Sequence, residues 1–78
     1  MRGLTKREHD IARLVGKGLP NEDIAAELGT SELTVKVQLR GIMRQYGFKN
    51  RVQLAVWTWL VGMTGPVGRD ARGMETGR

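Results

Sequence analysis

Apolar residues recur at helical spacing in four stretches of the chain, and each stretch has its own start and stop signals. In the first, Thr5 and Glu8 have the spacing of a capping box, in which each side chain satisfies a free backbone N–H. The apolar positions behind this cap are Ile11, Leu14 and Val15. Gly16 and Gly18 favour a helix end, because glycine adopts the left-handed conformation that closes helices. We therefore predict a first helix that ends near residue 15 or 16.

The second predicted helix is shorter. Pro20 suits its first turn, and the acidic residues that follow favour the positive N-terminal end of a helix. Its inward positions are Ile24, Ala25 and Leu28. Gly29 ends it after about two turns.

The third predicted helix carries apolar and basic residues on different sides. Ser31 is a natural N-cap, and Gly47 ends the helix just after residue 46. One apolar stripe consists of Val35, Leu39, Ile42, Met43 and Tyr46. Lys36, Arg40 and Arg44 lie at i, i+4 and i+8, off this stripe, so we expect them along the exposed side.

A fourth helix is apolar on two sides. Asn50, with Gln53 three residues later, caps a helix that reaches about residue 61. One stripe contains Val52, Val56, Trp59 and Met63, and a nearly opposite one contains Leu54, Trp57 and Val61. A helix of this kind must bury both sides, so one stripe closes the core and the other needs a partner. The pattern leaves open which stripe faces outward.

These elements predict an all-α domain over residues 1–64, followed by a flexible basic tail over residues 65–78, where apolar residues are isolated among glycine and arginine. A chain of 78 residues fits one domain. It has no cysteine and one histidine, His9, which we expect to be an exposed residue of the first helix. We therefore expect no metal and no cofactor. With no signal-peptide pattern and no membrane-spanning stretch, we expect a cytoplasmic protein.

The charges are distributed unevenly. Residues 1–32 hold five basic and six acidic side chains, whereas residues 33–64 hold five basic side chains and no acidic one. The five are Lys36, Arg40, Arg44, Lys49 and Arg51. A solvated surface normally mixes both signs, so an acid-free basic half indicates a polyanionic partner, of which nucleic acid is the simplest.

Three residues have the spacing of a helix-turn-helix. Two helices that cross closely need a small residue near the crossing, which Ala25 supplies. The tight turn needs a positive φ four residues later, which Gly29 tolerates. Val35, six residues further on, can anchor the recognition helix by an apolar contact. The basic stripe lies on the same helix that this spacing identifies as the recognition helix.

The sequence resembles the LuxR-type helix-turn-helix, the DNA-binding output domain of many bacterial response regulators and quorum sensors, and most closely its NarL-like branch. The matching motifs are Leu4-Thr5-x-Arg7-Glu8, Gly18-Leu19-Pro20-Asn21-x-x-Ile24-Ala25-x-x-Leu28, Ser31-x-x-Thr34-Val35-Lys36-Val37 and Asn50-Arg51-Val52-x-Leu54. The resemblance runs from about Leu4 to Trp59. It implies a four-helix domain that binds double-stranded DNA and regulates transcription as a homodimer paired through the fourth helix. Through this DNA binding, we expect the protein to be associated with the nucleoid.

The resemblance also implies roles for individual residues. The positions that match base contacts are Lys36, Val37 and Arg40. Backbone contacts are expected at Thr34, Arg44 and Arg51. The predicted dimer interface consists of Val52, Val56, Trp59 and Met63. The chemistry agrees, because lysine and arginine donate to guanine O6 and N7 and valine can touch a thymine methyl group.

The chain departs from the family pattern in two places. Gln38 stands where a histidine is usual, and Gly41 lies within the recognition helix, where it costs about 0.5–1 kcal/mol relative to alanine. The chain also has no room for the receiver or ligand-binding domain that normally comes first, so we expect a freestanding domain.

Two other binding functions fit parts of the pattern. The first is a protein-interaction module that pairs with another transcription regulator and modulates it, which Gln38 and Gly41 favour. The second is a domain like region four of sigma factors, against which the Asn50 cap and the apolar fourth helix count. We do not expect an enzyme, because no nucleophile is paired with a base.

Overall fold

The computed structural model describes residues 3–63, which form four helices and no strand. The helices are α1 (Lys6–Gly16), α2 (Asn21–Leu28), α3 (Glu32–Tyr46) and α4 (Arg51–Leu60). The predicted all-α class and the order of the four helices are confirmed. The predicted tail, residues 65–78, lies outside the described residues.

Side-chain caps begin three of the helices as the sequence predicts. In the capping box of α1, the Thr5 N–H donates to Glu8 Oε1 at 3.0 Å and the Glu8 N–H donates to Thr5 Oγ1 at 3.1 Å. The Ser31 hydroxyl oxygen accepts from the backbone N–H three residues on at 3.0 Å, and Asn50 Oδ1 does the same at the start of α4 at 2.9 Å. At α2 the N-cap position is held by Pro20, which makes no side-chain cap bond.

Glycines in the left-handed conformation close the turns after α2 and α3. Gly29 has a φ of +67° and Gly47 a φ of +75°. After α1 the left-handed residue is Gly18, with a φ of +90°, whereas Gly16 stays within the helix. A residue with a Cβ is strained at these positions.

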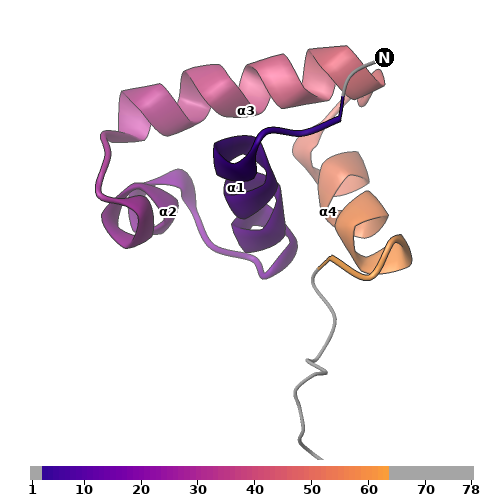
Figure 1. Cartoon of the computed structure of the whole chain (residues 1–78), viewed down its shortest axis with the longest axis horizontal. Coiled ribbons are helices and arrows are strands. Elements are labelled where there is room, and N and C mark those ends of the chain that lie inside the picture. Colours follow the sequence, from indigo (N-terminus) through magenta and orange to yellow (C-terminus); the bar gives the residue numbers. More distant parts are fainter. Residues whose placement is uncertain (1–2, 64–78) are drawn as a thin grey trace, which may run out of the picture.

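The α3 helix lies along one edge of the domain, at the top of Figure 1, with α1, α2 and α4 beneath it and α1 in the middle. The inward sides of all four helices meet in one hydrophobic core. Its buried residues are Ile11, Ala12, Leu14, Val15, Ile24, Ala25, Val35, Leu39, Ile42 and Leu54. The core holds α3 by its inward side and leaves the opposite side of the helix exposed to solvent.

The two sides of α4 have different surroundings. Leu54 is fully buried and Trp57 is partly buried against the core, so the second predicted stripe faces inward, except that Val61 is exposed. The outward side consists of four exposed residues, Val52, Val56, Trp59 and Leu60, which we call the α4 ridge.

No helix within residues 3–63 is long and apolar enough to cross a membrane.

Met63 does not extend this ridge. The helix ends at Leu60, and the Met63 N–H turns back to donate to the Thr58 carbonyl oxygen at 2.8 Å. The Met63 side chain is partly buried against the core. The helical register that grouped Met63 with Val52 and Val56 therefore stops three residues before it.

Candidate nucleic-acid interface

The helix-turn-helix consists of α2, the turn around Gly29, and α3. Ala25 is 6% exposed and Val35 is fully buried, so both lie between the helices as their spacing predicts. The Thr30 N–H donates to the Ala25 carbonyl oxygen at 2.9 Å, which closes the end of α2 over the turn. This arrangement holds α3 as a firmly anchored helix with one side facing outward.

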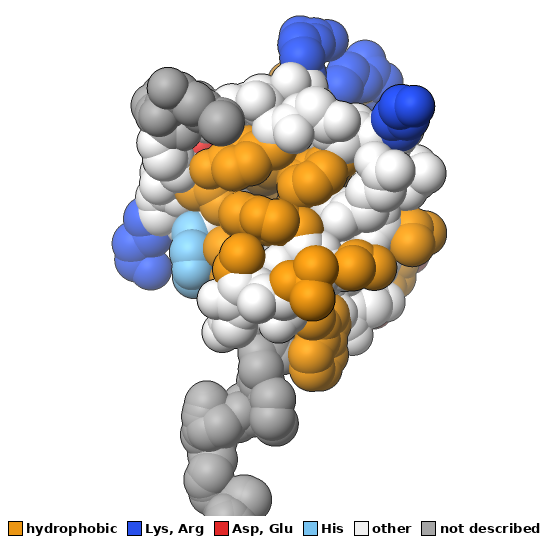
Figure 2. Space-filling view, turned by 90° about the vertical axis from the view of Figure 1, so that its right-hand side faces the viewer, with side chains coloured by type: hydrophobic (Ala, Val, Ile, Leu, Met, Phe, Trp, Pro, Cys, Tyr) orange, Lys and Arg blue, Asp and Glu red, His pale blue; other side chains and the backbone are white. Residues whose placement is uncertain are grey.

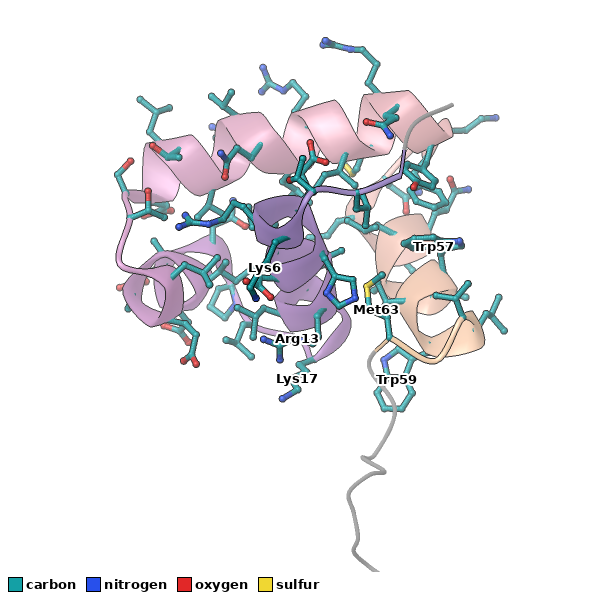
Figure 3. All side chains as sticks on the ribbon, viewed as in Figure 1. Lys6, Arg13, Lys17, Trp57, Trp59 and Met63 are labelled. Carbon is teal, nitrogen blue, oxygen red and sulfur yellow. The ribbon has the colours of Figure 1, made fainter. Side chains whose placement is uncertain are left out.

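The outward side of α3 carries the predicted base contacts. Lys36, Val37 and Arg40 are all exposed, and so is Arg44 one turn beyond Arg40. Figure 3 shows nitrogen-tipped side chains projecting from the side of α3 turned away from α1 and α2. The three cations make no ion pair with any carboxylate in residues 3–63 and remain available to a polyanion.

Thr34 lies at the N-terminal end of the same helix. Its Oγ1 accepts a 2.8 Å hydrogen bond from the Ser31 hydroxyl, and that hydroxyl oxygen accepts from the Thr34 N–H. A hydroxyl has one donor and two acceptor lone pairs, so the bond with Ser31 leaves the Thr34 O–H able to donate to a phosphate. The geometry is compatible with the predicted backbone contact.

Arg51 has an intramolecular role that the sequence pattern did not indicate. Its guanidinium donates to Asn21 Oδ1 at 2.5 Å and to the Leu19 carbonyl oxygen at 2.6 Å. Asn21 is the first residue of α2, so Arg51 ties the start of α4 to the start of the helix-turn-helix. These partners are separated by about thirty positions, and no local pattern reveals such a contact. The predicted contact of Arg51 with DNA stays a prediction.

A further residue on the outward side of α3 was not among the predicted contacts. Leu33 is 69% exposed and lies one turn before Val37, which is 59% exposed. The sequence signal for it was simple, because Leu33 is a large apolar residue that falls outside the buried stripe of its own helix. The outward side of α3 thus carries two aliphatic residues and Lys36 in its N-terminal half and Arg40 and Arg44 further along.

The α4 ridge is the other exposed feature. Val52, Val56 and Trp59, all predicted interface residues, lie on it, while Met63 lies against the core. Trp59 is 53% exposed, and its indole Nε1 donates to the Gly16 carbonyl oxygen at 2.8 Å, which fixes one edge of the ring to α1. Figure 2 shows hydrophobic side chains gathered on the α4 side of the molecule, with lysine and arginine side chains above them.

The two departures from the family pattern differ in their surroundings. Gly41 is exposed, and a Cβ added there would meet nothing within 4 Å. Gln38 is partly buried, and its Oε1 is buried without a hydrogen-bond partner in the described part of the chain. At Gly41 the outward surface of α3 therefore has no side chain above the backbone. At Gln38 the unsatisfied buried oxygen is slightly destabilising.

Residues 2–58 match the family model of the bacterial regulatory proteins of the luxR family. The chain is similar to the nitrate/nitrite response regulator protein NarL of Escherichia coli, with 46% identity over 54 residues, which are 69% of this chain and 25% of that protein. It is also similar to the two-component response regulator PprB of Pseudomonas aeruginosa, with 47% identity over 68% of this chain and 19% of that protein. The transcriptional regulatory protein UhpA of Escherichia coli is 44% identical over 67% of this chain and 26% of its own length. The matched segment thus spans about a quarter or less of each relative.

Proposed function

The chain belongs to the luxR family of bacterial regulatory proteins and carries its DNA-binding, transcription-regulating helix-turn-helix. From this premise we propose that it binds a specific operator as a homodimer. Double-stranded DNA is the proposed partner. The α3 helix enters the major groove, where Lys36, Val37 and Arg40 contact base edges. Thr34 and Arg44 contact the DNA backbone, and Arg51 does so with the N–H groups that are not bonded to Leu19 and Asn21.

The observation that carries this proposal is the outward side of α3. Lys36, Arg40 and Arg44 form no ion pair within residues 3–63 and project from a helix that the turn and the core anchor on its other side. Such cations neutralise phosphates and release counterions, which supplies salt-dependent affinity, while those aimed at base edges add discrimination. The proposal therefore assigns both kinds of contact to one helix.

The proposed dimer pairs two α4 ridges. Val52, Val56, Trp59 and Leu60 are large apolar side chains left exposed on one helix, and exposed patches of this kind mark interaction sites. A two-fold axis through α4 sets two recognition helices on two half-sites, so the operator should be an inverted repeat with half-sites about one helical turn apart.

A DNA-selection experiment tests the proposal. Random duplex DNA is selected on the protein at two stated salt concentrations and sequenced. We expect enrichment of inverted half-sites, and an affinity for the selected site that falls with salt at a log–log slope of about −2 per protomer, from two phosphates neutralised by Arg44 and Lys49. Failure to enrich any sequence, or a flat salt dependence, contradicts it.

A second candidate function is a protein-interaction module that modulates another regulator. The exposed apolar side chains of the α4 ridge favour it, because such a surface can pair with the fourth helix of a related regulator as well as with that of a second copy. Sedimentation of the protein alone and mixed with the luxR-type regulators of its own genome separates the two. A homodimer supports operator binding, whereas a monomer that forms only mixed complexes supports the interaction module.

A further inference from the structure

Two large aliphatic side chains stand in solvent on the outward side of α3. Leu33 is 69% exposed and Val37 is 59% exposed. They are one helical turn apart, on the same side as Arg40 and Arg44. Neither belongs to the core, which α3 contacts through its opposite side. Apolar groups of this size are costly to leave in water unless a partner covers them.

Their place on the helix indicates which partner that is. Leu33 is the second residue of α3 and Val37 the sixth, so both lie in the N-terminal half of the helix. In a helix-turn-helix this half contacts base edges, while cations further along the helix reach the backbone. The exposed aliphatic pair therefore faces the bases.

The major groove offers one apolar group to such a pair. Among the four bases, only thymine carries a methyl group, at C5, and this group projects into the major groove. At a rise of about 1.5 Å per residue the two side chains start about 6 Å apart along α3, close to two base-pair steps of about 3.4 Å. Two thymines separated by one base pair within a half-site match this spacing.

We propose that Leu33 and Val37 together read the methyl groups of two nearby thymines in each half-site. The inference rests on the proposed operator binding and adds a specificity residue, Leu33, to it. Leu33 and Val37 select for thymine by covering its methyl group, while Lys36 and Arg40 select by hydrogen bonds. The half-site thus contains an aliphatic contact region and a hydrogen-bonded region side by side.

The test replaces single thymidines of the selected site by deoxyuridine. This removes one methyl group and leaves base pairing and every hydrogen-bonding group unchanged. Affinity is measured for wild type, Leu33→Ala, Val37→Ala and the control Arg44→Ala, with helicity checked by circular dichroism. We expect two positions in each half-site at which deoxyuridine weakens wild-type binding about fourfold, the value for one buried carbon.

The variants assign each methyl group to a side chain. Leu33→Ala should bind thymidine and deoxyuridine equally at one of the two positions, and Val37→Ala at the other. Arg44→Ala should lose affinity for all DNA yet keep the fourfold difference at both. The inference is overturned, while operator binding still stands, if every deoxyuridine site is bound within twofold of the thymidine site. It is also overturned if the Leu33→Ala protein keeps the difference between thymidine and deoxyuridine at both positions. If no site can be selected, operator binding itself fails and this inference falls with it.

Discussion

The outward sides of α3 and α4 differ in chemistry although both helices anchor themselves in the same core. The outward side of α3 carries Lys36, Arg40 and Arg44 beside two aliphatic residues, whereas the α4 ridge carries no charge. A cationic surface attracts a polyanion from a distance, but a charge-free apolar surface is covered only by another apolar surface. The two surfaces of this one domain are therefore suited to different partners, a polyanion on α3 and an apolar surface on α4.

The largest effect should come from placing a charge on the α4 ridge. Val56 is 51% exposed, so Val56→Glu should keep the fold but abolish dimerisation. Losing the second half-site should lower affinity for the full operator about 100-fold or more, because linked half-sites gain affinity through effective concentration. Sedimentation, circular dichroism and operator titration measure the three quantities.

The matched control is Val61→Glu, because Val61 is equally exposed but lies off the ridge. It should remain dimeric. Trp59→Glu is a less clean variant, since it also removes the indole bond to Gly16. A wild type that stays monomeric on DNA, or a folded Val56→Glu protein with unchanged affinity, would refute the dimer.

The next largest effect separates two kinds of cation within α3. Lys36→Ala and Arg40→Ala should each cost about 1–3 kcal/mol of operator binding and relax preference at a defined base pair. Arg44→Ala should weaken all sequences alike and reduce the salt slope by about one. Titrations against the operator and its single-base variants distinguish these outcomes, and a uniform loss from all three changes would contradict the division.

Arg51 tests whether a basic residue outside α3 belongs to the DNA surface or to the fold. Arg51→Met removes the bonds to Asn21 and Leu19 and should lower the free energy of unfolding by about 1–2 kcal/mol, less than a fully buried charged pair because the site is partly exposed. Urea unfolding measures this, with Lys49→Met as the exposed control. Unchanged stability together with a salt slope reduced by about one would place Arg51 on the phosphates instead.

The smallest effect concerns Gly41. Since a Cβ there meets nothing, Gly41→Ala should raise the free energy of unfolding by about 0.5–1 kcal/mol. Gly29→Ala, at a φ of +67°, should lower it by about 1–2 kcal/mol. Thermal or urea unfolding compares the two. If the stabilised Gly41→Ala protein loses operator affinity, DNA approaches the α3 backbone closely at this point; a destabilised one would contradict the open surroundings.

Local signals were enough to predict the helices, because caps such as Ser31 and turn glycines such as Gly29 act within a few residues. The sequence also predicted that α4 is apolar on two sides, but its outward side was settled only by packing against α1. The two hydrogen bonds of Arg51 could not be predicted from the sequence, since Leu19 and Asn21 lie about thirty positions away, before and at the start of α2. Met63 was grouped with the stripe by helical spacing alone, whereas the helix ends at Leu60 and the chain turns at Gly62, which has a φ of +79°.

The two tryptophans give the molecule its own optical reporter. Trp57 packs against Tyr46 and Phe48 in tilted ring contacts, with centroids 5.1 and 5.7 Å away, while Trp59 lies on the α4 ridge. In a Trp57→Phe protein the remaining tryptophan emission comes from Trp59, which is exposed in the monomer and which a partner covers in the proposed dimer. Its emission should move to shorter wavelength as concentration rises, so association can be followed without a dye.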